Sequence, residues 1–374
     1  MNYKYYMPTK VIMGKDCIVK NSKLLKGLGK KALLVTGAHS AKANGSQADI
    51  IKALESEGID YEVFDKVMSN PTIKCVYEGA EFAKEKQVDC IIAIGGGSPM
   101  DAAKGIALLA AQDITEDKLF SGDYEAIVLP MAFVPTTAGT GSEVTQYSIL
   151  TNDKAQTKMS IATELIFPKV SFLDGKYMEA LGVTTTINTA IDALSHSVEG
   201  MLSVKASTIS DALAVESIKM IMECVPALLK ALEKKDTSVI TLGMRDKLLH
   251  ASLLGGMVIA QTGTTAVHAM GYSLTYFKDI DHGRANGLLL GEYLRLVEKE
   301  QPDLAQVIIK AMNLNQVDEL IELMNTCFGE KEVINIEEIN RYAHLAIQTK
   351  NINNCLVKPN EADIKEMFVS TFLK

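Results

Sequence analysis

The 374-residue sequence has no block of basic residues, and its formal net charge is −8. These two features argue against nucleic acid or an anionic membrane as the main partner. No apolar run is long enough to span a bilayer and no charged-then-apolar signal opens the chain, so we expect a cytoplasmic protein. None of the six scattered cysteines belongs to a C-x-x-C pair, which favours free thiols in a reducing compartment.

The overall composition is ordinary for a globular protein, with 47% hydrophobic and 22% charged residues. The chain is long for a single hydrophobic core, so two domains are expected. Strand and helix signals alternate through the first half, with apolar strands at 31–37 and 89–96 and amphipathic helices at 47–58 and 72–86. This alternation predicts a doubly wound, Rossmann-like α/β domain with a parallel sheet over residues 1–180.

The pattern changes after about Thr184, where strand signals vanish and apolar residues recur at helical spacing. Residues 181–374 are therefore expected to form a second, all-helical domain. Within this domain Pro226 interrupts a long helical pattern and is expected to kink or split that helix.

A glycine turn, Gly95–Gly97, follows an apolar strand and precedes a helix. Glycines let a phosphate approach backbone N–H groups, and a helix N-terminus attracts anions. Ser98 is expected to cap the helix, Pro99 to start it and Asp101 to complete a capping box, and Lys104 one turn later also favours a phosphate. The alternative is a plain tight turn, because the usual G-x-G-x-x-G fingerprint is absent. The residues predicted to bind the cofactor here are Gly96, Gly97, Ser98 and Asp101.

A second loop, Pro135–Ser142, also follows an apolar strand and is rich in threonine and glycine. Its hydroxyls and backbone donors suit a pyrophosphate or a ribose, although by itself the segment resembles an ordinary turn. The residues predicted to contact the cofactor in this loop are Thr136, Thr137, Thr140 and Ser142.

Half of the six histidines combine with one aspartate in a pattern that suits a metal. Asp192 and His196 lie four residues apart, which on a helix places both side chains on one face. His268 and His282 follow, each near the end of an expected helix. Three imidazoles and one carboxylate can hold a divalent transition metal and leave positions open for a substrate. Together with a dinucleotide site the set predicts metal-assisted hydride transfer, whereas an isolated Asp-x-x-x-His pair is more typical of a helix surface.

Four segments resemble, in this order, motifs of the iron-containing (group III) alcohol dehydrogenases. They are GGGSPMDAAK at 95–104, PTTAGTGSEVT at 135–145, DALSHSVEG at 192–200, and HAM followed by HGRAN within 268–286. The resemblance covers nearly the whole chain. It implies an N-terminal domain that binds a nicotinamide cofactor, a helical C-terminal domain and a metal held between them.

The resemblance also implies which residues hold the metal, which is Fe²⁺ or else Zn²⁺. The family's metal-ligand positions correspond to Asp192, His196, His268 and His282. These residues are expected to take part in catalysis through the metal that they bind. The positions that border the cofactor correspond to Asn70, Thr145 and Lys158. The implied reaction is the reversible interconversion of a primary alcohol and its aldehyde with NAD(P)(H). A homodimer is implied as well, with the segment 4–14 pairing across subunits.

The sequence departs from the family pattern at two positions. Tyr272 stands where the family often has a second histidine, so the proton carrier is unassigned and the tyrosine is interpreted as a ring that lines the site. Gly37 follows the first long strand, where NAD-preferring members tend to carry an acid. Because no carboxylate would repel a 2′-phosphate there, and Ser40 and Lys42 could donate to it, NADP(H) is expected to be preferred over NAD(H).

Two other functions stay open from the sequence. A glycerol dehydrogenase or a dehydroquinate-synthase-like enzyme would share the architecture, but a phosphate substrate would need a basic cluster that the motif-bearing helices lack. A nucleotide-binding sensor with a closed structural metal site is an alternative of another class. Binding of NADPH without consumption of an aldehyde would favour the sensor.

Overall fold

The computed structural model describes residues 3–373, whose contacts divide the chain into two compact units. One unit runs from Met7 to Ala180, and the other comprises the chain from Leu181 onwards together with the segment up to Tyr6. The N-terminal segment differs in this respect from the expected first domain. The main chain of Tyr6 exchanges two hydrogen bonds with the side-chain amide of Gln261, at 2.9 and 2.8 Å, and these bonds tie the segment to the second unit.

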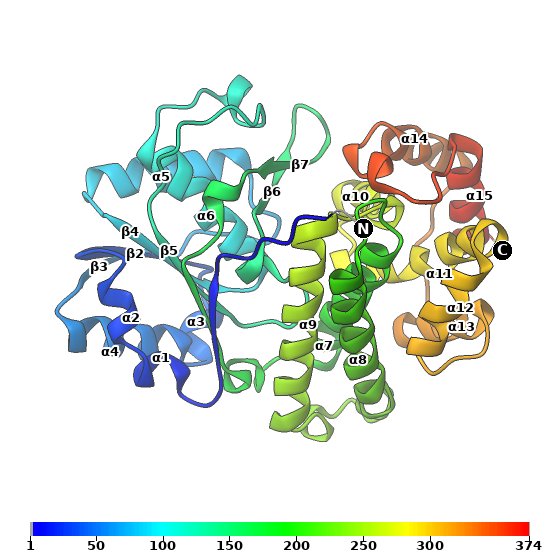
Figure 1. The fold of residues 1–374 in the computed structure, drawn as a ribbon, viewed down its shortest axis with the longest axis horizontal. Helices are drawn as coiled ribbons and strands as arrows, with labels where there is room; N and C mark the ends of the chain where they lie inside the picture. The colour runs from blue at the N-terminus through cyan, green and yellow to red at the C-terminus, as the bar shows by residue number, and fades with distance from the viewer. Residues whose placement is uncertain (1–2, 374) are drawn as a thin grey trace. The chain divides into compact units, whose positions relative to one another are not determined.

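A parallel sheet forms the centre of the first unit (Figure 1). Its strands are β1 (Lys10–Met13), β2 (Lys31–Thr36), β3 (Asp60–Phe64), β4 (Cys90–Gly95), β5 (Met131–Pro135) and β8 (Val170–Leu173). They lie in the order β1–β8–β5–β4–β2–β3, and every neighbouring pair is parallel. The predicted doubly wound sheet is therefore confirmed, and β1 pairs with β8 of its own chain.

Helices cover both faces of this sheet, because its central strands are apolar on both sides. The helices of the unit are α1 (Cys17–Lys20), α2 (Lys23–Lys26), α3 (Ser40–Ala43), α4 (Ser46–Glu57), α5 (Ile73–Glu85) and α6 (Gly97–Ala111). Along β2, Leu33 and Val35 are buried in a core shared with α5 and α6, while Ala32 and Leu34 are buried in a core shared with α1, α2 and α4. β4 and β5 are paired in parallel up to Gly95 and Pro135, so the glycine turn and the loop after β5 begin at the same edge of the sheet.

An antiparallel hairpin, β6 (Tyr147–Asn152) and β7 (Thr157–Ala162), follows the threonine-glycine loop and lies outside the predicted strands. Its sequence is largely polar, so its strand signal is weak. The hairpin is held by Leu150 and Ile161, which are fully buried in the core shared with α5 and α6. The hairpin carries Lys158, on β7, close to the loops of the first unit.

The second unit is helical, as predicted. Its helices are α7 (Val183–Met201), α8 (Thr208–Lys234), α9 (Leu242–Thr262), α10 (Ala266–Lys278), α11 (His282–Glu300), α12 (Pro302–Ala311), α13 (Val317–Phe328), α14 (Ile336–Ile347) and α15 (Glu361–Phe372). Helices α7, α8 and α9 lie side by side, and α11 also packs on α7 (Figure 1). Helix α8 continues through Pro226, so the expected split is wrong. The buried neighbours Val225 and Leu228 anchor the helix on both sides of the proline.

The six cysteines are buried and free, as the sequence predicts. Burial raises the pKa of Cys17 and that of Cys90 to about 12, so both thiols stay protonated at neutral pH. No helix among residues 3–373 combines the length and the apolar character that crossing a membrane requires.

Candidate active site

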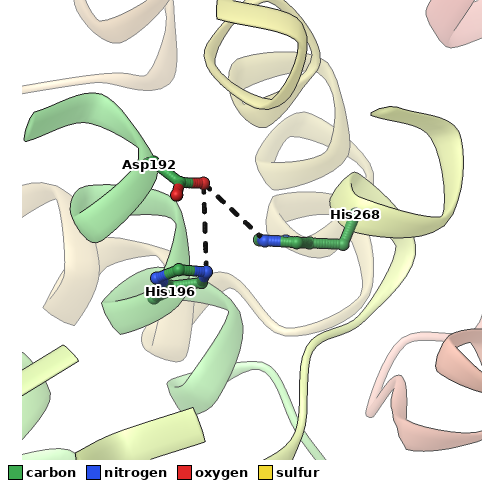
Figure 2. Close-up of side chains that lie close together, drawn as sticks. All are labelled: Asp192, His196 and His268. Atoms are coloured by element: carbon green, nitrogen blue, oxygen red, sulfur yellow. Dashed lines mark ion pairs between the residues drawn. The ribbon is translucent and has the colours of Figure 1, made fainter. Parts of the chain in front are cut away.

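Helix α7 carries the first two predicted metal ligands. Asp192 and His196 lie one turn apart, and their side chains are only 4% and 5% exposed. Asp192 Oδ1 lies 3.9 Å from His196 Nε2 (Figure 2). The predicted placement of both side chains on one helix face is confirmed.

Two further histidines reach the same carboxylate oxygen from other helices. His268 lies in the first turn of α10, and His282 is the first residue of α11. Nε2 of His268 lies 3.8 Å from Asp192 Oδ1, and Nε2 of His282 lies 3.9 Å from it. Atoms that bind one metal at about 2.1 Å are spaced by roughly 3–4 Å. Because donor atoms of Asp192, His196 and His268 all lie within 4.8 Å of one another, this buried group fits a metal ion.

The buried carboxylate is compensated by the rings around it. Burial by itself would raise the pKa of Asp192, but the positive charge that His196, His282 and His268 carry when protonated, together with the amide of Asn286, lowers it by more. The pKa of Asp192 therefore lies below its ordinary value, and the group is ionised at neutral pH. An ionised carboxylate among imidazoles is the form in which these side chains bind a metal.

In the first unit the two predicted cofactor loops pack directly on each other. β4 ends at Gly95 and α6 begins at Gly97. A Cβ on Gly96 would lie 3.0 Å from Thr137 Oγ1, and a Cβ on Gly97 would lie 2.6 Å from Thr140 Cγ2. The close approach of the second loop therefore requires glycine at 97.

The predicted cap of α6 is wrong. The helix starts two residues early, with Gly96 rather than Ser98 as its N-cap, and no side chain of the described residues caps it. Ser98 Oγ instead accepts from the N–H of Asn70 at 3.2 Å, and Asp101 accepts from Ser142 Oγ at 2.6 Å. Both side chains are thus engaged by partners outside the helix. A first turn without a side-chain cap suits a site where backbone N–H groups bind an anion.

Lys104 lies beneath the second loop and does not reach the surface. Its ammonium donates to Ser142 Oγ at 2.7 Å, to Thr145 Oγ1 at 3.1 Å and to the carbonyl oxygen of Tyr147 at 2.8 Å. Burial lowers the pKa of Lys104 to about 8, although nearby carboxylates oppose this shift. Lys104 therefore fixes the loop that carries Ser142 and Thr145, instead of the expected contact with a phosphate.

Two other residues predicted to contact the cofactor, Lys158 and Asn70, lie beside Ser98. Lys158 Nζ donates to Asn70 Oδ1 at 2.8 Å, and the N–H of Asn70 donates to Ser98 Oγ. Asn70 has a φ of 56°, a conformation that asparagine adopts more readily than most residues. The N–H of Thr136 donates to the carbonyl oxygen of Gly95 at 2.9 Å. These bonds join the hairpin, the turn before α5 and both loops into one surface of the first unit.

The family model described as iron-containing alcohol dehydrogenase matches residues 8–175, and the model of the Fe-containing alcohol dehydrogenase C-terminal region matches residues 186–372. Alcohol dehydrogenase 4 of Schizosaccharomyces pombe is 36% identical over 76% of this chain and 66% of its own length. 1,3-Propanediol dehydrogenase of Citrobacter freundii is 35% identical over 79% of this chain and 73% of its own length. The crystal structure of an iron-containing alcohol dehydrogenase from Thermotoga maritima matches with a TM-score of 0.91 and 36% identity, covering 100% of both chains.

The chain belongs to the iron-containing alcohol dehydrogenase family. As a member it is an NAD(P)-dependent oxidoreductase that interconverts alcohols and aldehydes. The resemblance of its four motifs is therefore confirmed. The two alternatives from the sequence, a dehydroquinate-synthase-like enzyme and a nucleotide-binding sensor, lose their support.

The amide of Asn286 lies among the side chains predicted to bind the metal, although no sequence pattern singled it out. Its Nδ2 lies 3.0 Å from Asp192 Oδ1, 3.2 Å from His268 Nε2 and 3.3 Å from His282 Nε2. Because a carboxylate only accepts, Nδ2 donates one hydrogen to Asp192, and its second hydrogen is available to only one of the two ring nitrogens that face it. The spacing of four residues between His282 and Asn286 is the signal that could have identified it.

Tyr272 packs beside two of the histidine rings that are predicted to bind the metal. Its ring stacks on that of His282, with centroids 6.0 Å apart and an interplanar angle of 13°. It meets the His268 ring edge-on, with centroids 6.5 Å apart. The structure therefore places Tyr272 as a ring that lines the ligand group, in agreement with the interpretation from the sequence.

The residues predicted to select the cofactor follow β2. Gly37 comes directly after this strand, and Ser40 begins the short helix α3. Lys42 Nζ forms an ion pair with Asp65 Oδ2 at 2.7 Å, in which both side chains are more than a third exposed. The carboxylate of Asp65 therefore lies beside Lys42, although no acid directly follows β2. Asp65 follows β3 instead of β2.

Proposed function

We propose that Asp192, His196, His268 and His282 hold one catalytic divalent metal ion, Fe²⁺ or else Zn²⁺. The observation that carries the proposal is that three imidazole Nε2 atoms each lie 3.8 or 3.9 Å from one oxygen of Asp192. Three neutral imidazoles and one carboxylate leave a divalent ion with a net positive charge. When bound, the ion would supply Lewis acidity toward the oxygen of the alcohol or aldehyde.

The burial of these side chains would strengthen the interaction between the positively charged metal ion and a bound substrate. Asp192 and His268 are 3% exposed and His196 is 4% exposed, so little water shares their environment. In such a site electrostatic interactions act more strongly on a bound substrate than they would in water. The side chain of His282 is 27% exposed, which supports entry of the substrate from its side.

The first unit would bind the nicotinamide nucleotide. Backbone N–H groups at the start of α6 and the threonine hydroxyls packed over them suit a pyrophosphate. Asp101 and Lys104 would act from below, by fixing Ser142 and the loop around it. The proposed contacts are Gly37, Ser40, Asn70, Gly96, Gly97, Ser98, Thr136, Thr137, Thr140, Ser142, Thr145 and Lys158, and Asp101 would contribute through Ser142.

The enzyme would act in the cytoplasm on a short primary alcohol and its aldehyde, as a homodimer. β1 is the edge strand of the sheet, and the outer side of an edge strand carries main-chain groups that can pair with a second copy. Light scattering coupled to size exclusion would test this state, and a mass of one chain, 40.6 kDa, would contradict the dimer.

Turnover with and without metal tests the proposed reaction. Protein reconstituted anaerobically with Fe²⁺ is expected to consume NADPH in the presence of a short-chain aldehyde, and the metal-free sample is not. If the loaded protein bound NADPH without consuming aldehyde, the reaction would be refuted and nucleotide sensing would be supported.

Cofactor choice gives a second prediction. We expect kcat/KM to be higher for NADPH than for NADH, because Gly37 offers no carboxylate and Lys42 could reach the 2′-phosphate. Asp65→Asn should raise kcat/KM for NADPH by roughly threefold, because an exposed ion pair of modest strength no longer occupies Lys42.

Steady-state kinetics with both nucleotides measure these effects. The matched control is Asp113→Asn, which breaks an equally short exposed pair, 2.7 Å from Lys84, just beyond the far end of α6. Equal or better efficiency with NADH would contradict the preference. An Asp65→Asn variant that behaved like the control would contradict the role of Lys42.

A further inference from the structure

Glu199 is a fully buried carboxylate on α7, three residues after His196. Its Oε1 accepts from the N–H of Thr265 at 2.8 Å, from Thr265 Oγ1 at 2.7 Å and from the N–H of His268 at 3.3 Å. Its Oε2 contacts Nδ1 of the His268 ring. One carboxylate therefore meets both the backbone and the ring of a proposed metal ligand on another helix.

Glu199 caps the helix that carries His268. Thr265 is the N-cap residue of α10, yet its own side chain makes no capping bond. Glu199 supplies the acceptor from α7, to the N-cap N–H and to the N–H of the third helical residue, His268. Unpaired N–H groups and the helix dipole both favour a negative charge at this end. The start of α10 is thus fixed relative to the helix that carries the other two buried ligands.

The contacts of the two ring nitrogens of His268 agree on where its proton lies. A carboxylate only accepts, so Nδ1 donates its N–H to Glu199. In the neutral ring Nε2 then carries the lone pair, and it lies 3.2 Å from the amide nitrogen of Asn286. Burial would raise the pKa of Glu199, but His268 and Thr265 lower it by more, so its pKa lies below the ordinary value.

We propose that Glu199 is a positioning residue for the metal, which holds the His268 ring in the Nδ1–H tautomer and aims its Nε2 at Asp192. The inference rests on the proposed metal site and adds a second buried negative charge to it. A carboxylate behind a ligating imidazole also makes that imidazole a stronger donor. Glu199 itself does not touch the reacting atoms.

Binding of Co²⁺ in the absence of substrate and nucleotide tests this role. Glu199→Gln preserves the shape but replaces one acceptor oxygen by an NH₂ group, which would face donors of Thr265 or His268. The metal-free proteins are titrated with Co²⁺ against a competing chelator. We expect the variant to bind Co²⁺ roughly 10–100-fold more weakly and to show a changed visible d–d spectrum.

The matched control is Ser197→Ala. It removes a buried hydroxyl from the same helix, where Ser197 Oγ donates to the carbonyl oxygen of Ala193 and contacts Ser217 Oγ at 2.8 Å. Some loss of stability is expected, but Co²⁺ affinity and spectrum should stay those of the wild type. A lower melting temperature in Glu199→Gln with wild-type affinity would overturn the proposal, because Glu199 would then only cap α10.

Failure of the metal site and failure of this inference are distinguishable. Wild-type protein that bound no Co²⁺ would refute the site itself, whereas equal binding by wild type and variant would refute only the role of Glu199. If the variant does not fold, ¹⁵N-histidine NMR of the Zn²⁺-loaded wild type decides, since the chain has six histidines. A downfield proton on Nδ1 of His268 is expected, and a His268 Nδ1 without a proton would overturn the proposal.

Discussion

Asp192→Asn is expected to lower turnover of the Fe²⁺-loaded enzyme by roughly 10³-fold or more and to strip most of its metal. The reason is that all three imidazole Nε2 atoms face Asp192 Oδ1, so the variant removes the anionic ligand at the centre of the group. Lewis-acid stabilisation is worth several kcal/mol, and each 1.4 kcal/mol is about tenfold in rate. Metal content after gel filtration and kcat at saturating NADPH measure the two effects.

The control for this variant is Asp211→Asn. Asp211 is a partly buried carboxylate in the first turn of α8, in the same helical unit, and burial raises its pKa. It has no place in the proposed site, so metal content and kcat should stay unchanged. Full metal content and full turnover in Asp192→Asn would show that the metal site has been assigned to the wrong residues.

The ligand candidates were predictable because the information is local. A spacing of four residues on α7 is sufficient to place Asp192 and His196 together. The strand-helix alternation likewise predicted the sheet, because apolar runs such as β4 must be buried on both faces. Gly58 has a φ of 68° directly after α4, as local backbone preference requires at the end of a helix.

The residues that support the ligands were not predictable, because their partners come from other helices. Glu199 acts on His268 across the α7–α10 contact, and Asn286 reaches Asp192 from α11. No spacing within one segment encodes the contact of Glu199, and the four-residue spacing from His282 places Asn286 beside that ring without showing that it reaches Asp192. Only the motif order pointed to the right region, and the packing of three helices decides which side chains within it meet.

The incorrect predictions have the same origin. Ser98 has the local preference of an N-cap, but Asn70 engages its hydroxyl and the helix starts at Gly97. Pro226 lacks an N–H and should weaken α8, but packing on both sides of it keeps the helix continuous. In both cases tertiary contacts outweigh a preference worth about 1–3 kcal/mol.

Lys104→Met is expected to lower the free energy of unfolding by about 3–5 kcal/mol, the usual cost of removing one partner from a buried charged group. Lys104 is 0% exposed and donates to Ser142, Thr145 and the carbonyl oxygen of Tyr147. The methionine fills the space but leaves these acceptors, and Asp101 beside them, without the ammonium. Because Ser142 and Thr145 belong to the proposed cofactor loop, NADPH affinity should fall as well, which quenching of NADPH fluorescence can measure.

The pH dependence reports the cost of burying the charge on Lys104, which is separate from the hydrogen bonds that its amine donates. The pKa of Lys104 is about 8 in the folded protein and 10.5 for an ordinary lysine, so the folded state releases this proton first. Between these pH values the unfolded chain binds more protons, and the group therefore adds stability as the pH rises from 8 towards 10.5. Denaturant unfolding should show this gain in the wild type and lack it in Lys104→Met. Lys84→Met, which breaks an exposed pair with Asp113, should cost less than about 1 kcal/mol at any pH, and a Lys104→Met variant that matched it would refute the structural role of the buried ammonium.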